Sequence, residues 1–310
     1  MKRVALFTHP ACLRHDPGPG HPECPDRLRV ITAALDHPDF VSLLRELAPL
    51  ATEQQLALVH PPEYVAEMLA LAPNPDDIIT IDGDTFVGDG SIEAARRAAG
   101  GVIAGVDAVI EGWADAAFAA VRPPGHHAER SQAMGFCLFA SAAIAARHAR
   151  ARWGLNRVAV VDFDVHHGNG TQHIFAADPH LFYVSSHQFP CYPGTGAHSE
   201  TGVGNIVNLS LPPGSGSTKF RAAWQNEGLP ALRAFAPELL IISAGFDAHL
   251  ADPLAQICLQ TEDFGWITDA LTAVADEHCN GRLVSALEGG YNLEALAASA
   301  ALHVRRLMRL

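Results

Sequence analysis

A short apolar run that ends in a cluster of acids and histidines constrains this chain most. Residues 158–161 (Val-Ala-Val-Val) have the length of a buried strand, and Asp-Phe-Asp-Val-His-His-Gly-Asn follows directly at 162–169. In extended chain, alternate side chains point to the same side, so Asp164 and His166 can reach one ion while the residues between them face the core. A carboxylate oxygen and an imidazole nitrogen suit zinc or a similar divalent metal. The sequence therefore predicts a metal site at the end of a strand.

Five further apolar runs end in polar or reactive side chains. The runs and the motifs after them are 4–7 (Thr8-His9), 116–121 (Gly125-His126-His127), 181–184 (Ser185-Ser186-His187), 239–242 (Gly245-Phe246-Asp247) and 283–287 (Glu288-Gly289-Gly290-Tyr291). Such runs are typical of parallel strands that are buried on both faces. Because ligands bind beyond the carboxyl ends of the strands in open α/β sheets, we expect one concave site served by many loops.

Residue chemistry alone leaves the roles of several of these side chains open. Asp247 could bind the metal or cap a helix after the glycine turn. His126 and His127 could be catalytic or structural, and Tyr291 could be a tyrosine packed on the surface of a turn. The segment 162–169 could be a polar turn, although the matching clusters elsewhere in the chain argue against this.

Composition favours one large domain. The chain has 310 residues, of which 48% are hydrophobic and 18% charged, and no linker or low-complexity tract interrupts it. We therefore expect a single domain over residues 1–310 with a sizeable core. Since no apolar stretch reaches the roughly 18 residues of a membrane span and the first run is too short for a signal peptide, we expect a cytoplasmic protein. Six cysteines without a CxxC pair argue against a thiolate zinc site.

The charge of the chain bears on its partners. The net charge is −13, and lysine occurs only at positions 2 and 219. Binding to nucleic acid needs basic patches that neutralise phosphates, so no nucleic-acid partner is expected. A cationic partner is electrostatically favoured instead, although many proteins are acidic simply for solubility.

Two stretches carry helix signals, and one segment is predicted to be irregular. Ser91 is placed to cap a helix that begins at Ile92, and residues 139–152 are rich in alanine with basic residues late. Residues 8–27 contain five prolines and are predicted to form a loop at the rim of the site.

Taken together, these motifs resemble the zinc-dependent histone deacetylase superfamily, in particular its class II-like branch, which includes bacterial deacetylase-like proteins and acetylpolyamine amidohydrolases. The resemblance extends from residues 21–27 (HPECPDR) to residues 289–292 (GGYN). It implies the arginase/deacetylase fold, a three-layer α/β/α domain around a parallel eight-stranded sheet. It also implies an amidohydrolase that removes acetyl or other acyl groups from amines with zinc-activated water.

The resemblance implies the metal ligands and the group that stabilises the oxyanion. Asp164, His166 and Asp247 would bind zinc, and ferrous iron is a credible substitute at such ligands. Tyr291 would donate a hydrogen bond to the substrate carbonyl. Its presence favours an active hydrolase.

The tandem histidines have distinct implied roles. By the same resemblance, His127 is the general base and later the proton donor to the amine, and His126 is its electrostatic partner. His126 should pair with Asp162, and His127 with Asn169. Because an aspartate stabilises imidazolium and an asparagine only orients the ring, the two pKa values should be separated.

Further residues are implied to bind substrate and a structural potassium ion. Aromatic walls suit the apolar stem of an acylated lysine. The implied substrate-contacting residues are Gly135, Phe136, Tyr192, Leu254 and Gly290. The implied potassium site comprises Asp162, Asp164, His166, Ser185 and Ser186, with a second around Phe175, Asp178 and Leu181.

The substrate depends on the rim of the site, because acetyl-lysine of a protein or peptide and an acetylated polyamine share the same reactive end. Leu254 stands where polyamine-selective relatives carry an acid, which favours acetyl-lysine. Asp16, Glu23 and Asp252 could instead supply rim carboxylates for a cationic amine.

Two other classes stay open. A manganese ureohydrolase of the arginase type shares the fold but bridges two metals with additional ligands. A non-catalytic acyl-lysine binder would not need Tyr291 together with both histidines.

Overall fold

The centre of the structure is an eight-stranded sheet in which every neighbouring pair is parallel. This computed structural model describes residues 2–75 and 77–310. The strand order is β2-β1-β5-β10-β9-β6-β7-β8. The strands are β1 (Val4–Thr8), β2 (Leu44–Leu47), β5 (Ala116–Ala119), β6 (Val158–Asp162), β7 (Leu181–Gln188), β8 (Ile206–Leu211), β9 (Leu239–Ala244) and β10 (Leu283–Leu287). The predicted parallel eight-stranded sheet is therefore confirmed.

The six apolar runs become six interior strands for a simple physical reason. Every residue of β5, β6, β7, β9 and β10 is buried, and so are the first four of β1. Parallel strands covered on both faces need apolar side chains at consecutive positions, which the runs supply. The edge strand β2 is mostly exposed and carries charged residues, as edge strands commonly do.

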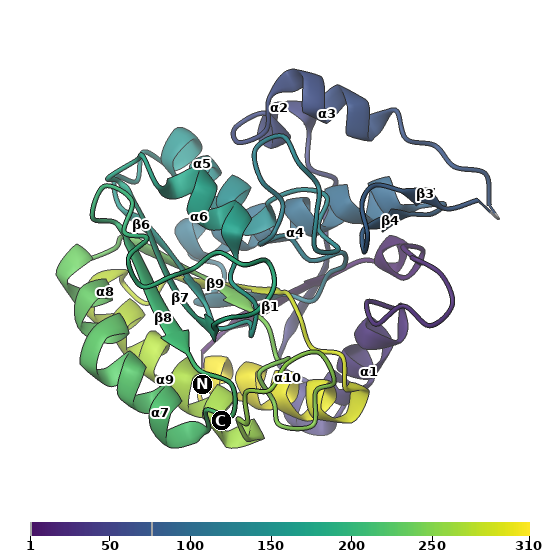
Figure 1. The fold of residues 1–310 in the computed structure, drawn as a ribbon. Coiled ribbons are helices and arrows are strands. Elements are labelled where there is room, and N and C mark those ends of the chain that lie inside the picture. Colours follow the sequence, from purple (N-terminus) through teal and green to yellow (C-terminus); the bar gives the residue numbers. More distant parts are fainter. Residues whose placement is uncertain (1, 76) are drawn as a thin grey trace.

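Helices cover both faces of the sheet and give three layers (Figure 1). One face carries α4 (Ser91–Glu111), α5 (Ser141–Trp153) and α6 (Asn169–Phe175), with α2 (Glu53–Leu56) and α3 (Pro62–Leu69) on the same side. The other face carries α1 (Asp26–Leu35), α7 (Ser217–Ala223), α8 (Leu229–Phe235), α9 (Thr261–His278) and α10 (Leu293–Met308). Among the described residues, no helix combines the length and apolar character required to cross a bilayer.

The predicted helix boundaries need small corrections. Ser91 is the first residue of α4 rather than its cap, because its hydroxyl accepts a hydrogen bond from the backbone N–H of Gly88 at 2.9 Å. The alanine-rich helix predicted at 139–152 is α5, which spans Ser141–Trp153. The segment 8–27 is irregular apart from the last residue of β1, one 3₁₀ turn (Pro10–Leu13) and the first residues of α1.

The sheet brings the motifs to one edge. The carboxyl ends of all eight strands point the same way, so the polar residues after β5, β6, β9 and β10 are neighbours although they are far apart in sequence. Residues 189–205 return from β7 to β8 without a helix. A short antiparallel pair, β3 (Ile79–Thr80) and β4 (Phe86–Val87), lies outside the main sheet.

Candidate active site

Three side chains suited to bind a metal meet at the carboxyl edge of the sheet. Asp164 and His166 follow β6, and Asp247 follows the neighbouring strand β9. The Nδ1 atom of His166 lies 3.2 Å from Oδ1 of Asp164 and 3.1 Å from Oδ2 of Asp247. The ligand atoms of these three buried side chains lie within 4.8 Å of one another. Within residues 2–75 and 77–310, no other set of His, Cys, Asp or Glu side chains forms such a group.

The charges at this group fit a divalent cation. Burial and the neighbouring Asp164 raise the pKa of Asp247 to about 7, because two carboxylates share a buried site. A cation would relieve this repulsion. Backbone N–H groups orient both carboxylates, since Gly289 donates to Asp164 Oδ2 at 2.7 Å and Val165 donates to Asp247 Oδ1 at 2.9 Å. Two oxygens and one nitrogen suit zinc or ferrous iron and leave coordination positions for water and substrate.

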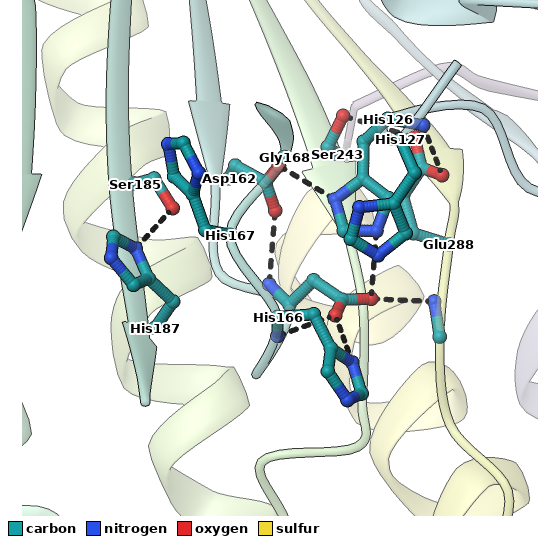
Figure 2. Close-up of polar contacts among 12 residues, drawn as sticks. His126, His127, Asp162, His166, His167, Gly168, Ser185, His187, Ser243 and Glu288 are labelled. Atoms are coloured by element: carbon teal, nitrogen blue, oxygen red, sulfur yellow. Dashed lines mark hydrogen bonds and ion pairs between the residues drawn. The ribbon is translucent and has the colours of Figure 1, made fainter. Parts of the chain in front are cut away.

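Glu288, which follows β10, holds the tandem histidines in place. Its Oε2 atom accepts hydrogen bonds from the backbone N–H groups of Gly125 at 2.7 Å and His126 at 3.1 Å. Its Oε1 atom accepts one from the hydroxyl of Ser243 at 3.0 Å. Figure 2 shows this carboxylate beside the two histidines. One buried side chain therefore connects the strand ends of β5, β9 and β10.

Both predicted partners of the tandem histidines are present. Nδ1 of His126 lies 2.9 Å from Oδ2 of Asp162, and Nδ1 of His127 lies 2.8 Å from Oδ1 of Asn169. Asp162 also accepts a hydrogen bond from the hydroxyl of Tyr183 at 2.9 Å. The first ring therefore contacts a carboxylate and the second contacts a neutral amide.

The pKa values of the two rings separate as predicted. Burial alone would lower the pKa of His126, but nearby carboxylates, led by Asp162, raise it to about 10. Burial lowers the pKa of His127 well below its usual value, and positive charge on His126 and His166 lowers it further. At neutral pH, His126 is therefore charged and His127 is a neutral base.

A cavity of about 200 Å³ opens above these groups. The ring of Phe136 meets that of Tyr291 edge-on with centroids 5.9 Å apart, and Tyr192 meets His127 with centroids 5.1 Å apart. The residues that line the cavity are Asp84, His127, Gly135, Phe136, His166, Tyr192, Leu254 and Tyr291. Four of the five predicted substrate-contacting residues are in this lining. The fifth, Gly290, is not.

A tight turn presents the aromatic wall. Gly135 and Phe136 both have positive φ, 55° and 68°, and the backbones of Met134 and Cys137 pair on either side of them. A Cβ atom on Gly135 would lie 2.5 Å from Cδ2 of His127. Glycine at position 135 therefore allows the turn to lie directly against the ring of His127.

Two buried side chains support Tyr291. The guanidinium of Arg27 lies 4.8 Å from the centroid of the Tyr291 ring and donates to the carbonyl of Gly290 at 2.6 Å. Asp252 accepts a hydrogen bond from the backbone N–H of Tyr291 at 2.6 Å. Burial raises the pKa of Tyr291 well above its usual value despite the opposing charge of Arg27, so its hydroxyl stays a neutral donor.

The prediction of rim carboxylates was wrong for two residues. Glu23 is fully buried, with its carboxylate paired to Arg122 at 2.5 Å, so it cannot meet a substrate. Asp252 is only 8% exposed, because it binds the backbone of the Tyr291 loop. Asp16 is exposed but does not line the cavity.

Asp84 also lines the cavity, and the sequence motifs did not predict it. Burial, and then the neighbouring Asp82, raise the pKa of Asp84. The residue lies between β3 and β4, after only a short apolar stretch at 78–79. An acidic turn of this kind carried no strand-end signal.

The residues predicted to bind potassium come from the end of β6, from the segment that follows it and from β7. Asp162 on β6 is opposite Ser185 on β7 in the parallel register. In the described part of the chain, the buried hydroxyl of Ser186 has no hydrogen-bond partner. These oxygens are suitable donors for a hard cation.

At the second predicted potassium site, an amide side chain approaches the carbonyls of Phe175, Asp178 and Leu181. The amide nitrogen of Asn205 donates to the carbonyl oxygens of Phe175, Asp178 and Leu181 at 2.9, 3.0 and 2.7 Å. Because the amide has two N–H groups, it can bond fully to two of the three carbonyls, and potassium binding here stays a prediction.

Comparison with known proteins agrees with this geometry. A histone deacetylase domain profile matches residues 21–307. The histone deacetylase-like amidohydrolase of Pseudomonas aeruginosa is 39% identical, covering 94% of this chain and 82% of that protein. The polyamine deacetylase HDAC10 of Mus musculus is 38% identical, covering 92% of this chain and 45% of that protein. The crystal structure of the HDA15 HD domain superposes with a TM-score of 0.91 at 37% identity, covering 99% of this chain and 88% of that one. The chain belongs to the histone deacetylase family.

Proposed function

We propose that this chain forms a single catalytic domain that hydrolyses the amide of an acetylated or otherwise acylated amine. The observation that carries the proposal is the meeting of three groups in one cavity: a metal-ligand group, a neutral buried histidine and a neutral phenol. Amide hydrolysis needs an electrophilic centre, a base and an oxyanion donor, and these three groups supply them.

Asp164, His166 and Asp247 would hold zinc, with ferrous iron as the alternative. A bound zinc ion would polarise the amide carbonyl and lower the pKa of an attacking water. Potassium at Asp162 and Ser185 would balance negative charge beneath the site.

The protein's own groups then have distinct tasks. His127 takes the proton of the attacking water at Nε2, because its Nδ1 faces Asn169. Tyr291 donates a hydrogen bond to the carbonyl oxygen as it gains negative charge. Breaking the C–N bond releases a carboxylic acid and an amine, and His127 returns its proton to that amine while charged His126 stabilises the developing negative charge.

The non-catalytic acyl-lysine binder and the manganese ureohydrolase have less support than the amide hydrolase. One group of three ligands among the described residues gives no basis for a second metal. A reader of acyl-lysine would have no use for a base and an oxyanion donor facing the same metal group.

Acetyl-lysine of a protein or peptide is the substrate that the rim supports best. Leu254 lines the cavity and is 37% exposed, so an apolar side chain meets the substrate there. Neither Glu23 nor Asp252 offers a free carboxylate. Aromatic walls at Phe136 and Tyr192 suit the apolar stem of the acylated side chain.

Acetylated polyamine is the second candidate, and Asp84 favours it. Its carboxylate lines the cavity and could attract a cationic amine. The relative from Mus musculus named as a polyamine deacetylase adds to this reading.

The test compares turnover of an acetyl-lysine peptide with that of N-acetylputrescine by zinc-loaded protein, with Tyr291→Phe as control. Faster peptide cleavage that falls by about 10²–10³-fold in the control would support a peptide deacetylase. Preference for N-acetylputrescine would select the second candidate. A separate variant, Leu254→Glu, tests the rim position: it should raise N-acetylputrescine turnover if residue 254 selects the substrate. Turnover of neither compound would contradict removal of acetyl groups and would point to a different acyl group or to the non-catalytic acyl-lysine binder.

A further inference from the structure

A chain of polar contacts runs from His127 to the surface. Oδ1 of Asn169 lies 2.8 Å from Nδ1 of His127, and Nδ2 of Asn169 donates to Oε1 of Glu129 at 2.8 Å. Oε2 of Glu129 lies 2.7 Å from Nδ1 of His173. Asn169 is buried, Glu129 is half-buried and His173 is exposed. The base is therefore connected through one amide to a carboxylate that reaches solvent.

The donors and acceptors in this chain leave one arrangement. An asparagine amide can rotate by 180°, so its neighbours decide which end donates. Glu129 can only accept, and so can the sulfur of Met134, which lies 3.3 Å from the same nitrogen. The amide nitrogen of Asn169 must therefore face Glu129, and its oxygen must face His127. That oxygen can only accept a hydrogen bond, so Nδ1 of His127 must carry a proton.

This order has a chemical consequence at the site. A neutral imidazole has one protonated nitrogen, so a proton on Nδ1 leaves a lone pair on Nε2. Without an acceptor at position 129, the Asn169 amide could turn its nitrogen toward His127. The ring would then be held with its lone pair on Nδ1 and its proton on Nε2, which is the wrong form for a base.

We propose that Glu129 is a positioning residue that fixes the tautomer of His127 through Asn169. The inference rests on the proposed function, because it assumes that His127 is the base. The two histidines differ in how a carboxylate reaches them. Asp162 touches His126 directly, whereas the carboxylate of Glu129 is separated from His127 by a neutral amide. Glu129 therefore sets the direction of the hydrogen bonds with less direct attraction for a positive charge.

The test reads the tautomer directly. Long-range ¹H–¹⁵N spectra of protein labelled with ¹⁵N-histidine distinguish a proton on Nδ1 from one on Nε2, and His127→Ala identifies the signals of this ring. Wild type should show the Nδ1–H form at pH 8, and Glu129→Ala should show a mixture with the Nε2–H form. Glu238→Ala is the matched control, because this half-buried glutamate also accepts hydrogen bonds but binds Asn156 and Arg157 instead. An unchanged Nδ1–H form in Glu129→Ala would overturn the proposal.

An exchange of the two side chains separates positioning from general stability. Asn169→Asp alone places two carboxylates in contact and should impair the site. The double variant Asn169→Asp/Glu129→Gln restores a donor at position 129 and should recover the Tm lost in Asn169→Asp, while both variants keep a proton on Nδ1 of His127 because a carboxylate at position 169 only accepts. Glu129→Ala should lower kcat about tenfold and leave KM within twofold. A His127 ring without a proton on Nδ1 in either of these variants would contradict the proposal.

The two proposals fail in different ways. If wild type hydrolyses no acylated amine but its His127 tautomer depends on residue 129, the proposed function is wrong and the positioning role stands. If the enzyme is active and the tautomer does not depend on residue 129, only the positioning role is wrong.

Discussion

The imidazole rings of His126 and His127 lie 4.0 Å apart between centroids, yet their pKa values are shifted in opposite directions. The cause is the set of side chains around each ring. Carboxylates surround the first ring, whereas the second is buried beside positive charge and a neutral amide. A charged residue and a neutral base therefore occupy consecutive positions in the chain.

This relationship predicts a change in the pH dependence of His126→Ala. Charged His126 lowers the pKa of His127, so its removal should raise that pKa. Because His127 must be neutral to accept a proton, the loss of kcat/KM on the acid side should begin at higher pH than in wild type. Profiles of kcat/KM against pH would check this. His127→Ala should lose more than a hundredfold in activity at every pH, and an acid limb that does not move in His126→Ala would contradict the prediction.

Asp247→Asn should change stability in opposite directions with and without metal. In metal-free protein, burial and Asp164 raise the pKa of Asp247 to about 7, so the carboxylate destabilises the fold as pH rises from about 4 through 7. The neutral asparagine should therefore raise Tm of metal-free protein at pH 8. With zinc, the same substitution removes a charged ligand and should lower both Tm and zinc affinity. Thermal unfolding with chelator and with zinc measures both effects, and a shift of the same sign in each would argue against a metal site here. Asp247→Ala should lose more than a hundredfold in activity.

Gly135→Ala should damage catalysis more than folding. The added Cβ would lie 2.5 Å from the ring of His127, so the base must move. We expect at least a tenfold loss of kcat. Gly204→Ala is the matched control, because this glycine also has positive φ, at 91°, but a Cβ there would meet nothing within 4 Å. Equal losses of activity in the two variants would show that backbone strain, and not contact with His127, is responsible.

Asp252→Asn should act through Tyr291. Asp252 accepts hydrogen bonds from the backbone N–H groups of Tyr291 and Asn292 at 2.6 and 3.1 Å, and from that of Leu254 at 3.1 Å. Its replacement should lower kcat about tenfold by loosening Tyr291, the proposed oxyanion donor. In a Tyr291→Phe background the same substitution should cost little further, because the hydroxyl is already missing. Additive losses in the double variant would instead indicate an independent role.

Buried neutral histidines should make the fold sensitive to acid. Burial lowers the pKa of His303 to about 3 and that of His60 to about 4. In the unfolded chain these histidines have a pKa near 6.5. The stability from keeping the rings neutral is therefore present above that pH and is lost as pH falls from 6.5 through their pKa values in the folded protein. His303→Gln should therefore reduce the slope of the unfolding free energy against pH, between pH 6 and 4, by about 1.4 kcal/mol per pH unit. Urea unfolding of both proteins at several pH values measures the two slopes. Equal slopes in His303→Gln and wild type would contradict the prediction.

The parts of the site that follow strands could be predicted from the sequence. Asp164 and His166 are two residues apart just after an apolar run, and the side-chain alternation of extended chain predicts that both reach one ion, although residues 164–166 form a bend beyond the end of β6. Their nearness to Asp247 follows from strand order, which apolar runs do not specify. The family resemblance supplied that step, and the order of β6 beside β9 confirms the nearness.

Whether a carboxylate is free could not be predicted in the same way. Glu23 looks like a rim acid in sequence, but its partner Arg122 lies 99 residues away and buries it. Asp252 is likewise held by a loop 39 residues further on. Asp84, the acid that does reach the cavity, lies in a turn outside the main sheet and follows no buried strand. Exposure depends on tertiary partners, and local sequence carries little information about them.

The proposed metal ligands His166 and Asp247 are 81 residues apart in the chain. An ion shared by them would act as a reversible cross-link between two adjacent strands, and a permanent cross-link of that span would remove about 4–5 kcal/mol of freedom from the unfolded chain. No short fragment contains both ligands, so neither a nascent chain nor a partly folded one can hold the ion until β6 and β9 are side by side. Metal uptake would therefore mark the completion of the sheet, and chelators should accelerate unfolding more than they slow refolding.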